Sequence, residues 1–73
     1  MDKFERKLRE DEEYKNTIKL KSQEFNISKN KYYLYKVRNK NYILFFGKKL
    51  SEDFYNKLNE KFGSFYLICL NSN

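Results

Sequence analysis

The clearest pattern of apolar and polar residues lies mid-chain, in the stretch KYYLYKVRNKNYILFFG from Lys31 to Gly47. Its Tyr, Phe, Ile, Leu and Val residues suit a pleated, half-buried surface. Asn39 interrupts the run with a residue that tolerates positive φ. The pattern predicts a hairpin with strands at about 32–38 and 41–47 and a loop at Asn39-Lys40.

The length of this loop decides which side chains share a face. With a two-residue loop, Arg38 lies opposite Asn41, and the hairpin has one apolar and one mixed face. The apolar face holds Tyr33, Tyr35, Val37, Tyr42, Leu44 and Phe46, and the mixed face holds Tyr32, Leu34, Lys36, Arg38, Ile43 and Phe45. A three-residue loop is the alternative, because Lys40 stands where a type I′ turn prefers Gly. It would shift the pairing by one residue and move Tyr42, Leu44 and Phe46 to the basic face.

A helix at about 52–62 follows the hairpin. Ser51 is a good N-cap, acidic residues occupy the first turn, and Gly63 stands where the helix should end. The buried stripe consists of Phe54, Tyr55, Leu58 and Phe62. The next residues, at about 65–70, are apolar without alternation, which predicts a strand buried on both faces.

The strand, helix and strand from 41 to 70 predict a βαβ unit whose last strand runs parallel to 41–47. The sequence therefore predicts a single α+β domain over residues 1–73. We expect a small two-layer domain with a mixed sheet of three to five strands. The helix at 52–62 covers one face, and the N-terminal helix closes either the same face or the other.

The N-terminal segment predicts a helix at about 3–14, with Asp2 as its N-cap and Glu5 completing a capping box. The segment 15–28 is less clear. Its apolar residues favour a strand at about 17–21 and another at 24–28. A helix that continues to Phe25 is the alternative, because Tyr14, Ile18 and Phe25 lie near one stripe.

The net charge of +6 is concentrated around the hairpin. Residues 1–28 contain seven acidic and seven basic groups, and residues 51–73 contain three acidic and two basic groups. The excess lies in 29–50, which has no acid and carries Lys29, Lys31, Lys36, Arg38, Lys40, Lys48 and Lys49.

The residue types argue against an enzyme. The chain has no His, which is the commonest general base and metal ligand. Cys69 stands in an apolar run where burial would make its thiol inert. No phosphate-binding loop or zinc-ligand spacing occurs, so neither a cofactor nor a metal is expected.

Composition also suggests where the protein works. The single Cys fits a reducing compartment, and the chain shows neither a signal-peptide pattern nor an apolar stretch of about 20 residues. We therefore expect a cytoplasmic protein without membrane contact. A 73-residue chain has a small core, so a homodimer or a partner-stabilised monomer is expected.

The positive signal is for nucleic-acid binding, to DNA or RNA. Clustered Lys and Arg neutralise phosphates, and unpaired bases stack on aromatic rings. The candidate residues on and beside the hairpin are Tyr32, Lys36, Arg38, Lys40, Phe45, Lys48 and Lys49. A simpler explanation is that these lysines protect strand edges from aggregation.

The other hypothesis is an inhibitor that binds a nucleic-acid-processing protein. In size and Tyr/Phe content the chain is similar to small phage or plasmid accessory proteins. Many of those cover a functional surface of a host enzyme, among them antidefence and anti-CRISPR proteins. This similarity involves no motif, and no family is assigned.

Overall fold

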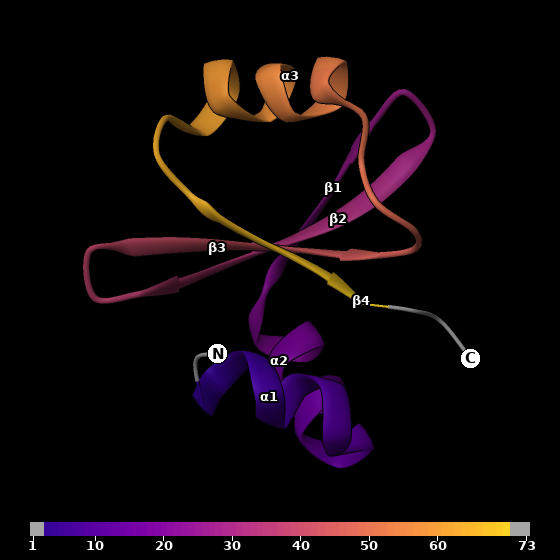
Figure 1. Cartoon of the computed structure of the whole chain (residues 1–73). Coiled ribbons are helices and arrows are strands. Elements are labelled where there is room, and N and C mark those ends of the chain that lie inside the picture. Colours follow the sequence, from indigo (N-terminus) through magenta and orange to yellow (C-terminus); the bar gives the residue numbers. More distant parts are fainter. Residues whose placement is uncertain (1–2, 71–73) are drawn as a thin grey trace.

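The computed structural model describes residues 3–70 (Figure 1). Asp2, the predicted first N-cap, lies outside these residues. The elements follow in the order α1 (Lys3–Glu10), α2 (Glu12–Lys21), β1 (Gln23–Ile27), β2 (Asn30–Val37), β3 (Lys40–Phe46), α3 (Glu52–Phe62) and β4 (Tyr66–Leu70).

The strands form one mixed sheet in the order β1-β2-β3-β4. The first three strands are antiparallel, and β4 runs parallel to β3 after the crossover through α3. This confirms the α+β class, the mixed sheet and the βαβ unit. The helices lie on both sides, with α1 and α2 on one face and α3 on the other (Figure 1). The domain thus has three layers, whereas the sequence predicted two.

Each face of the sheet has its own hydrophobic core. The core beneath α1 and α2 contains Leu8, Ile18, Leu44, Ile68 and Leu70. The core beneath α3 contains Tyr32, Leu34, Ile43 and Leu58. Because β2 and β3 are the central strands, both faces of the hairpin are buried, including the mixed face.

The hairpin loop is Arg38-Asn39, one residue earlier than predicted. Tyr35 pairs with Tyr42 and Tyr33 with Leu44, a shift of two positions from the two-residue-loop register. A shift of two leaves every strand side chain on its predicted face, so alternation alone cannot detect it. Arg38 takes the positive φ of the turn, at 57°.

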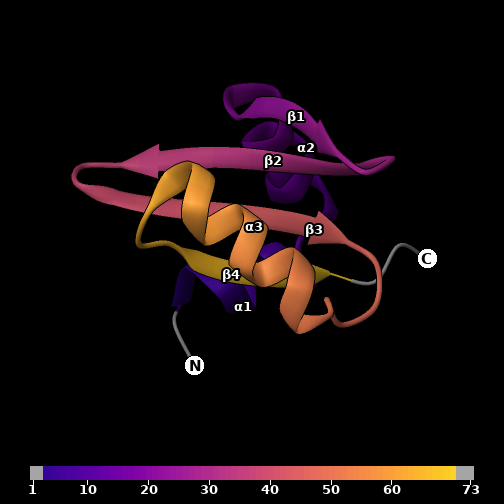
Figure 2. The ribbon, with the colours of Figure 1, turned by 90° about the horizontal axis from the view of Figure 1, so that it is seen from above.

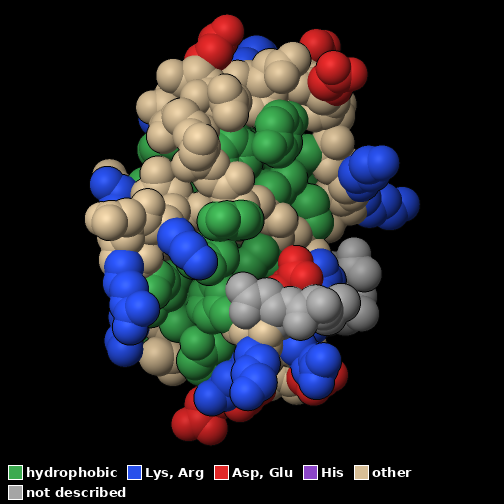
Figure 3. Space-filling model, turned by 60° about the vertical axis from the view of Figure 1, so that its left-hand side comes forward, with side chains coloured by type: hydrophobic (Ala, Val, Ile, Leu, Met, Phe, Trp, Pro, Cys, Tyr) green, Lys and Arg blue, Asp and Glu red, His purple; other side chains and the backbone are tan. Residues whose placement is uncertain are grey.

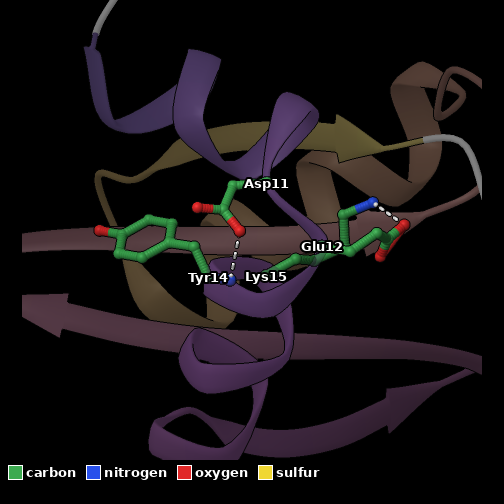
Figure 4. Close-up of polar contacts among 4 residues, drawn as sticks. All are labelled: Asp11, Glu12, Tyr14 and Lys15. Carbon is green, nitrogen blue, oxygen red and sulfur yellow. Dashed lines mark hydrogen bonds and ion pairs between the residues drawn. The ribbon is translucent and has the colours of Figure 1, made fainter.

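The N-terminal half differs more from the prediction. The helix expected at 3–14 is two helices, because Asp11 leaves helical geometry and caps α2. Its carboxylate accepts a hydrogen bond of 3.0 Å from the Tyr14 backbone N–H, and Lys15 pairs with Glu12 at 3.2 Å (Figure 4). Helix ends favour such a side-chain acceptor because their first N–H groups have no partner within the helix.

The strand predicted at 17–21 is instead the second half of α2. Ile18 is buried, whereas Leu20 is 88% exposed. A strand would have placed both on one face, so helical geometry explains their different burial. The alternative helix to Phe25 is right only as far as Lys21, and the strand expected at 24–28 is β1.

The second half follows the sequence more closely, although Tyr55, expected in the buried stripe of the helix, is 41% exposed. Ser51 accepts a hydrogen bond from the Phe54 backbone N–H, and Gly63 ends α3 with a φ of 74°. The last strand begins at Tyr66 and forms one edge of the sheet. Its burial is unequal, since Ile68 and Leu70 are buried whereas Tyr66 is exposed.

Candidate nucleic-acid interface

The five basic residues predicted as one surface lie at opposite ends of β3. Lys36, Arg38 and Lys40 are exposed around the β2–β3 loop, and Lys48 and Lys49 are exposed beyond the other end of the strand. The strand has seven residues. At about 3.3 Å per residue, it separates the groups by roughly 20 Å. The first three are called the hairpin cations below.

The two aromatic residues predicted to stack on bases belong to the core beneath α3. Tyr32 is fully buried, and its ring lies between those of Phe25 and Phe45, at 5.3 and 5.2 Å between centroids. Phe45 is half-buried in the same cluster. The Tyr32 ring is therefore not accessible to a base in this structure.

A different set of rings reaches the surface at the same end of the sheet as the hairpin cations, on the face that also carries Lys40. Tyr35, Tyr42 and Tyr66 are register partners on β2, β3 and β4 and are called the tyrosine row. The rings of Tyr42 and Tyr66 stack with centroids 5.3 Å apart and planes 28° apart. Phe4 of α1 lies over the inner end of the row, stacked on Tyr35 at 5.8 Å. The outer end remains open, because Tyr66 is 56% exposed.

The surface around Tyr66 combines aromatic, basic and polar groups. Lys40 Nζ lies 5.9 Å from the Tyr66 ring centroid. A hollow of about 300 Å³ lies beside this pair, where Asn41 Nδ2 donates a hydrogen bond to the Ser64 carbonyl at 3.4 Å. Figure 3 shows apolar side chains along this side of the molecule, with Lys and Arg side chains among and around them.

A second hollow of about 470 Å³, called the β4 groove, is also lined by Tyr66. It runs between α1 and α3 and is lined by Glu5, Tyr42, Tyr55, Phe65, Tyr66, Leu67 and Ile68. Tyr55 on its α3 wall is 41% exposed. Exposed tyrosines therefore stand at the groove's wall and at its end.

The hairpin cations are available for a ligand. The ion pairs found within residues 3–70 join Arg9 to Glu5, Lys15 to Glu12 and Lys31 to Glu24. None of these pairs uses a hairpin cation. A phosphate could therefore bind the hairpin cations without first breaking an ion pair between them and a carboxylate.

A hollow of about 600 Å³ beside the α1–α2 junction is a weaker candidate. It is lined by Lys3, Arg6, Lys7, Glu10, Asp11, Glu12 and Glu13. The charges are of both signs and partly compensate one another, and no aromatic residue lines the hollow. It therefore lacks the field of one sign that would attract a charged ligand.

Sequence reasoning did not include Tyr66 among the candidate binding residues. An unbroken apolar run predicts burial on both faces, and the run alone does not show that its strand forms the sheet edge. The signal that could have identified Tyr66 is its position. It lies at the start of a strand parallel to 41–47, which places it level with Tyr42.

No group of three or more His, Cys, Asp or Glu within residues 3–70 is arranged to hold a metal ion. Over the same residues, no helix has the length and apolar character needed to cross a membrane. Comparison with known protein families, characterised proteins and solved structures gives no match. The surface chemistry is therefore the basis for assigning a function.

Proposed function

We propose that this chain is a non-enzymatic binding protein that contacts single-stranded nucleic acid through the tyrosine row and the hairpin cations. The observation that carries the proposal is Tyr66. Its ring is exposed, is supported from beneath by Tyr42, and lies 5.9 Å from the Lys40 ammonium group.

Each part of this surface suits one part of a nucleotide. An unpaired base stacks on an exposed aromatic ring with about 1–3 kcal/mol of binding energy. Lys36, Arg38 and Lys40 neutralise the phosphates that flank such a base. A duplex hides the faces of its bases, so an exposed ring favours a single strand. Stacking tolerates every base, which makes the binding largely independent of sequence.

Inhibition of a nucleic-acid-processing protein is the second candidate. It is favoured by Tyr55 and Tyr66, which are exposed at the β4 groove. Tyrosine is enriched at the energetic centres of protein interfaces. Under this hypothesis the same surface covers a partner protein, and the hairpin cations match acidic groups on that partner.

Titration with labelled oligonucleotides at low salt separates the two. We expect single strands to bind more tightly than duplexes, and Tyr66→Ala to weaken single-strand binding by about 1–3 kcal/mol. Tyr66→Phe keeps the ring and should bind like the unchanged protein. Tyr55→Ala is the matched control, an exposed tyrosine outside the row. Absence of single-strand binding at low salt would reject the proposal, and affinity purification after nuclease treatment would then identify a protein partner.

A further inference from the structure

The outer edge of β4 offers backbone groups for pairing. Within residues 3–70, β4 pairs only with β3. The Leu70 carbonyl accepts a hydrogen bond of 2.7 Å from the Gly47 N–H, so the backbone groups of Leu70 face β3. Backbone groups alternate along a strand. Those of Ile68 therefore also face β3, and those of Leu67 and Cys69 face outward.

This edge lacks the protection that sheet edges usually carry. The strand sequence YLICL contains no charge, proline or glycine. The opposite edge, β1, has the polar sequence QEFNI, and its Glu24 forms an ion pair with Lys31 at 3.8 Å. Charged side chains on an edge strand discourage pairing with another chain. The two edges thus differ, and β4 is the one suited to accept a strand.

The surroundings leave access to this edge. Figure 2 shows β4 as the last strand on its side of the sheet, with α3 in front of the sheet and α1 behind it. The β4 groove lies between these helices, with Glu5 on one wall and Tyr55 on the other. Its floor includes Leu67 and Ile68, which are strand residues.

We propose that the occupant of this edge is β4 of a second copy, paired antiparallel about a two-fold axis at Ile68. In this register Leu67 lies opposite Cys69 of the partner subunit, and Cys69 lies opposite Leu67 of the partner subunit. All of these residues have outward backbone groups, so each pair exchanges two hydrogen bonds. The result is one continuous sheet through both copies.

Local charge favours a second copy in spite of the net charge of +6. The strand itself is uncharged. Glu5 on the groove wall pairs with Arg9 at 3.7 Å, so this wall carries both signs. Phe4 lies against Tyr42, and Leu8 packs with Ile68 and Leu70, so α1 runs along β4. A two-fold axis at Ile68 then brings Glu5 of one copy level with Arg9 of the partner subunit, which has the opposite charge.

Charge elsewhere gives the dimer a salt dependence. Antiparallel pairing brings the hairpin cations of one copy to the same end of the sheet as Lys48 and Lys49 of the partner subunit. Lys40 lies on β3, and Lys48 and Lys49 of the partner subunit follow that subunit's β3, so the nearest of these groups are three strand spacings apart, or about 14 Å. This exceeds the Debye length at physiological salt, about 8 Å, and is well within it at low salt. The dimer should therefore tighten as salt rises, whereas nucleic-acid binding weakens.

Sedimentation equilibrium over a range of protein and salt concentrations tests the dimer without any nucleic acid. Cys69→Pro removes an outward N–H and leaves the bonds to β3 intact, which edge strands tolerate. We expect it to weaken the dimer at least tenfold, while Cys69→Ala does not. A monomer at all concentrations, or a dimer that Cys69→Pro leaves unchanged, would overturn the proposal.

Amide hydrogen exchange keeps the test decisive if Cys69→Pro fails to fold. In the unchanged protein, exchange at the Leu67 and Cys69 amides should slow at least tenfold between dilute and concentrated samples. The Ile68 amide, bonded to β3, should be protected in both. If the Leu67 and Cys69 amides exchange at the same rate in dilute and concentrated samples, the proposed pairing of the two β4 strands is contradicted.

Discussion

The ring of Tyr66 stacks on that of Tyr42 with centroids 5.3 Å apart, although the whole of α3 separates the two residues in the chain. The pairing follows from the crossover, because α3 returns the chain to the end of the sheet where β3 begins. The parallel register then sets Tyr66 level with Tyr42 and with Tyr35 beyond it. The exposed ring of Tyr66 is thereby supported by Tyr42, whose own ring lies 4.8 Å from that of Phe4.

The salt dependence of oligonucleotide binding should identify which cations engage phosphates. Each phosphate on a single strand contributes about −0.7 to the slope of log K against log salt. With three to five phosphates bound, the slope is roughly −2 to −3.5. Replacing Lys36 and Arg38 by Ala should make it shallower by about 1.4.

Lys48 and Lys49 provide the matched control for this experiment. They carry the same charge but lie roughly 20 Å away, at the far end of β3. Their replacement by Ala should change the slope much less on an oligonucleotide of only a few nucleotides. Equal changes from the two double variants would show that the phosphates are not concentrated at the hairpin end.

Tyr32→Phe should leave the protein as stable as before or make it more stable. The Tyr32 hydroxyl is buried and has no hydrogen-bond partner of good geometry, although the Asn30 side chain lies near enough to act on its pKa. An unsatisfied buried polar group costs about 1–3 kcal/mol, and Phe keeps the ring between Phe25 and Phe45. Urea denaturation measures the difference. Tyr32→Ala is the contrasting variant and should cost about 3–5 kcal/mol, because it leaves a cavity.

Stability should fall at alkaline pH. Burial raises the pKa of the Tyr32 hydroxyl above 10.0, an effect that Asn30 partly offsets and the Cys69 thiolate reinforces. Burial, and to a lesser degree Tyr35, also raises the pKa of Tyr14. Below pH 10 both phenols are neutral in the folded and unfolded chains, and this contribution to stability is complete. As pH rises through the folded pKa values, the unfolded chain ionises first and the contribution is lost.

Urea midpoints measured from about pH 8 to about pH 11 check this effect. The decline should be smaller in Tyr32→Phe, which has one raised phenol fewer. An identical decline in both proteins would mean that Tyr32 ionises as readily when folded as when unfolded.

Asp11→Ala should destabilise the protein by about 1 kcal/mol, because it removes the acceptor for the Tyr14 backbone N–H. Asp11→Asn retains a side-chain oxygen and should cost much less. Thermal unfolding followed by circular dichroism compares the two variants. Equal losses would show that the negative charge matters more than the hydrogen bond.

The parts of the fold that were predictable are those with local signals. Ser51 and Gly63 mark the ends of α3, and alternation assigns the faces of the hairpin. The structure of residues 17–21 was not predictable. The spacing of Ile18 and Leu20 is compatible with a strand, and only the packing of α2 on the sheet shows that Ile18 alone is buried. The position of the hairpin loop was also not predictable, because a register shift of two residues leaves every side chain on the same face of the hairpin.

The candidate site was only partly predictable. The hairpin cations are exposed as expected, since charged residues near a turn remain solvated. Tyr32 was expected to be accessible and is buried, whereas Tyr66 was expected to be buried and is exposed. Both outcomes depend on contacts between distant parts of the chain. Burial of Tyr32 depends on where α3 docks, and exposure of Tyr66 depends on the order of strands in the sheet. Neither the burial of Tyr32 nor the exposure of Tyr66 can be inferred from the residues next to it in the sequence.

The core beneath α1 and α2 joins the two ends of the described chain, because Leu8 packs there with Ile68 and Leu70. Until the ribosome has made β4, α1 has only part of the surface that buries it. An isolated helix of eight residues is not stable in water. Although α1 is synthesised before the strands, it should therefore be among the last elements to become protected, and β1–β3 should form before it docks.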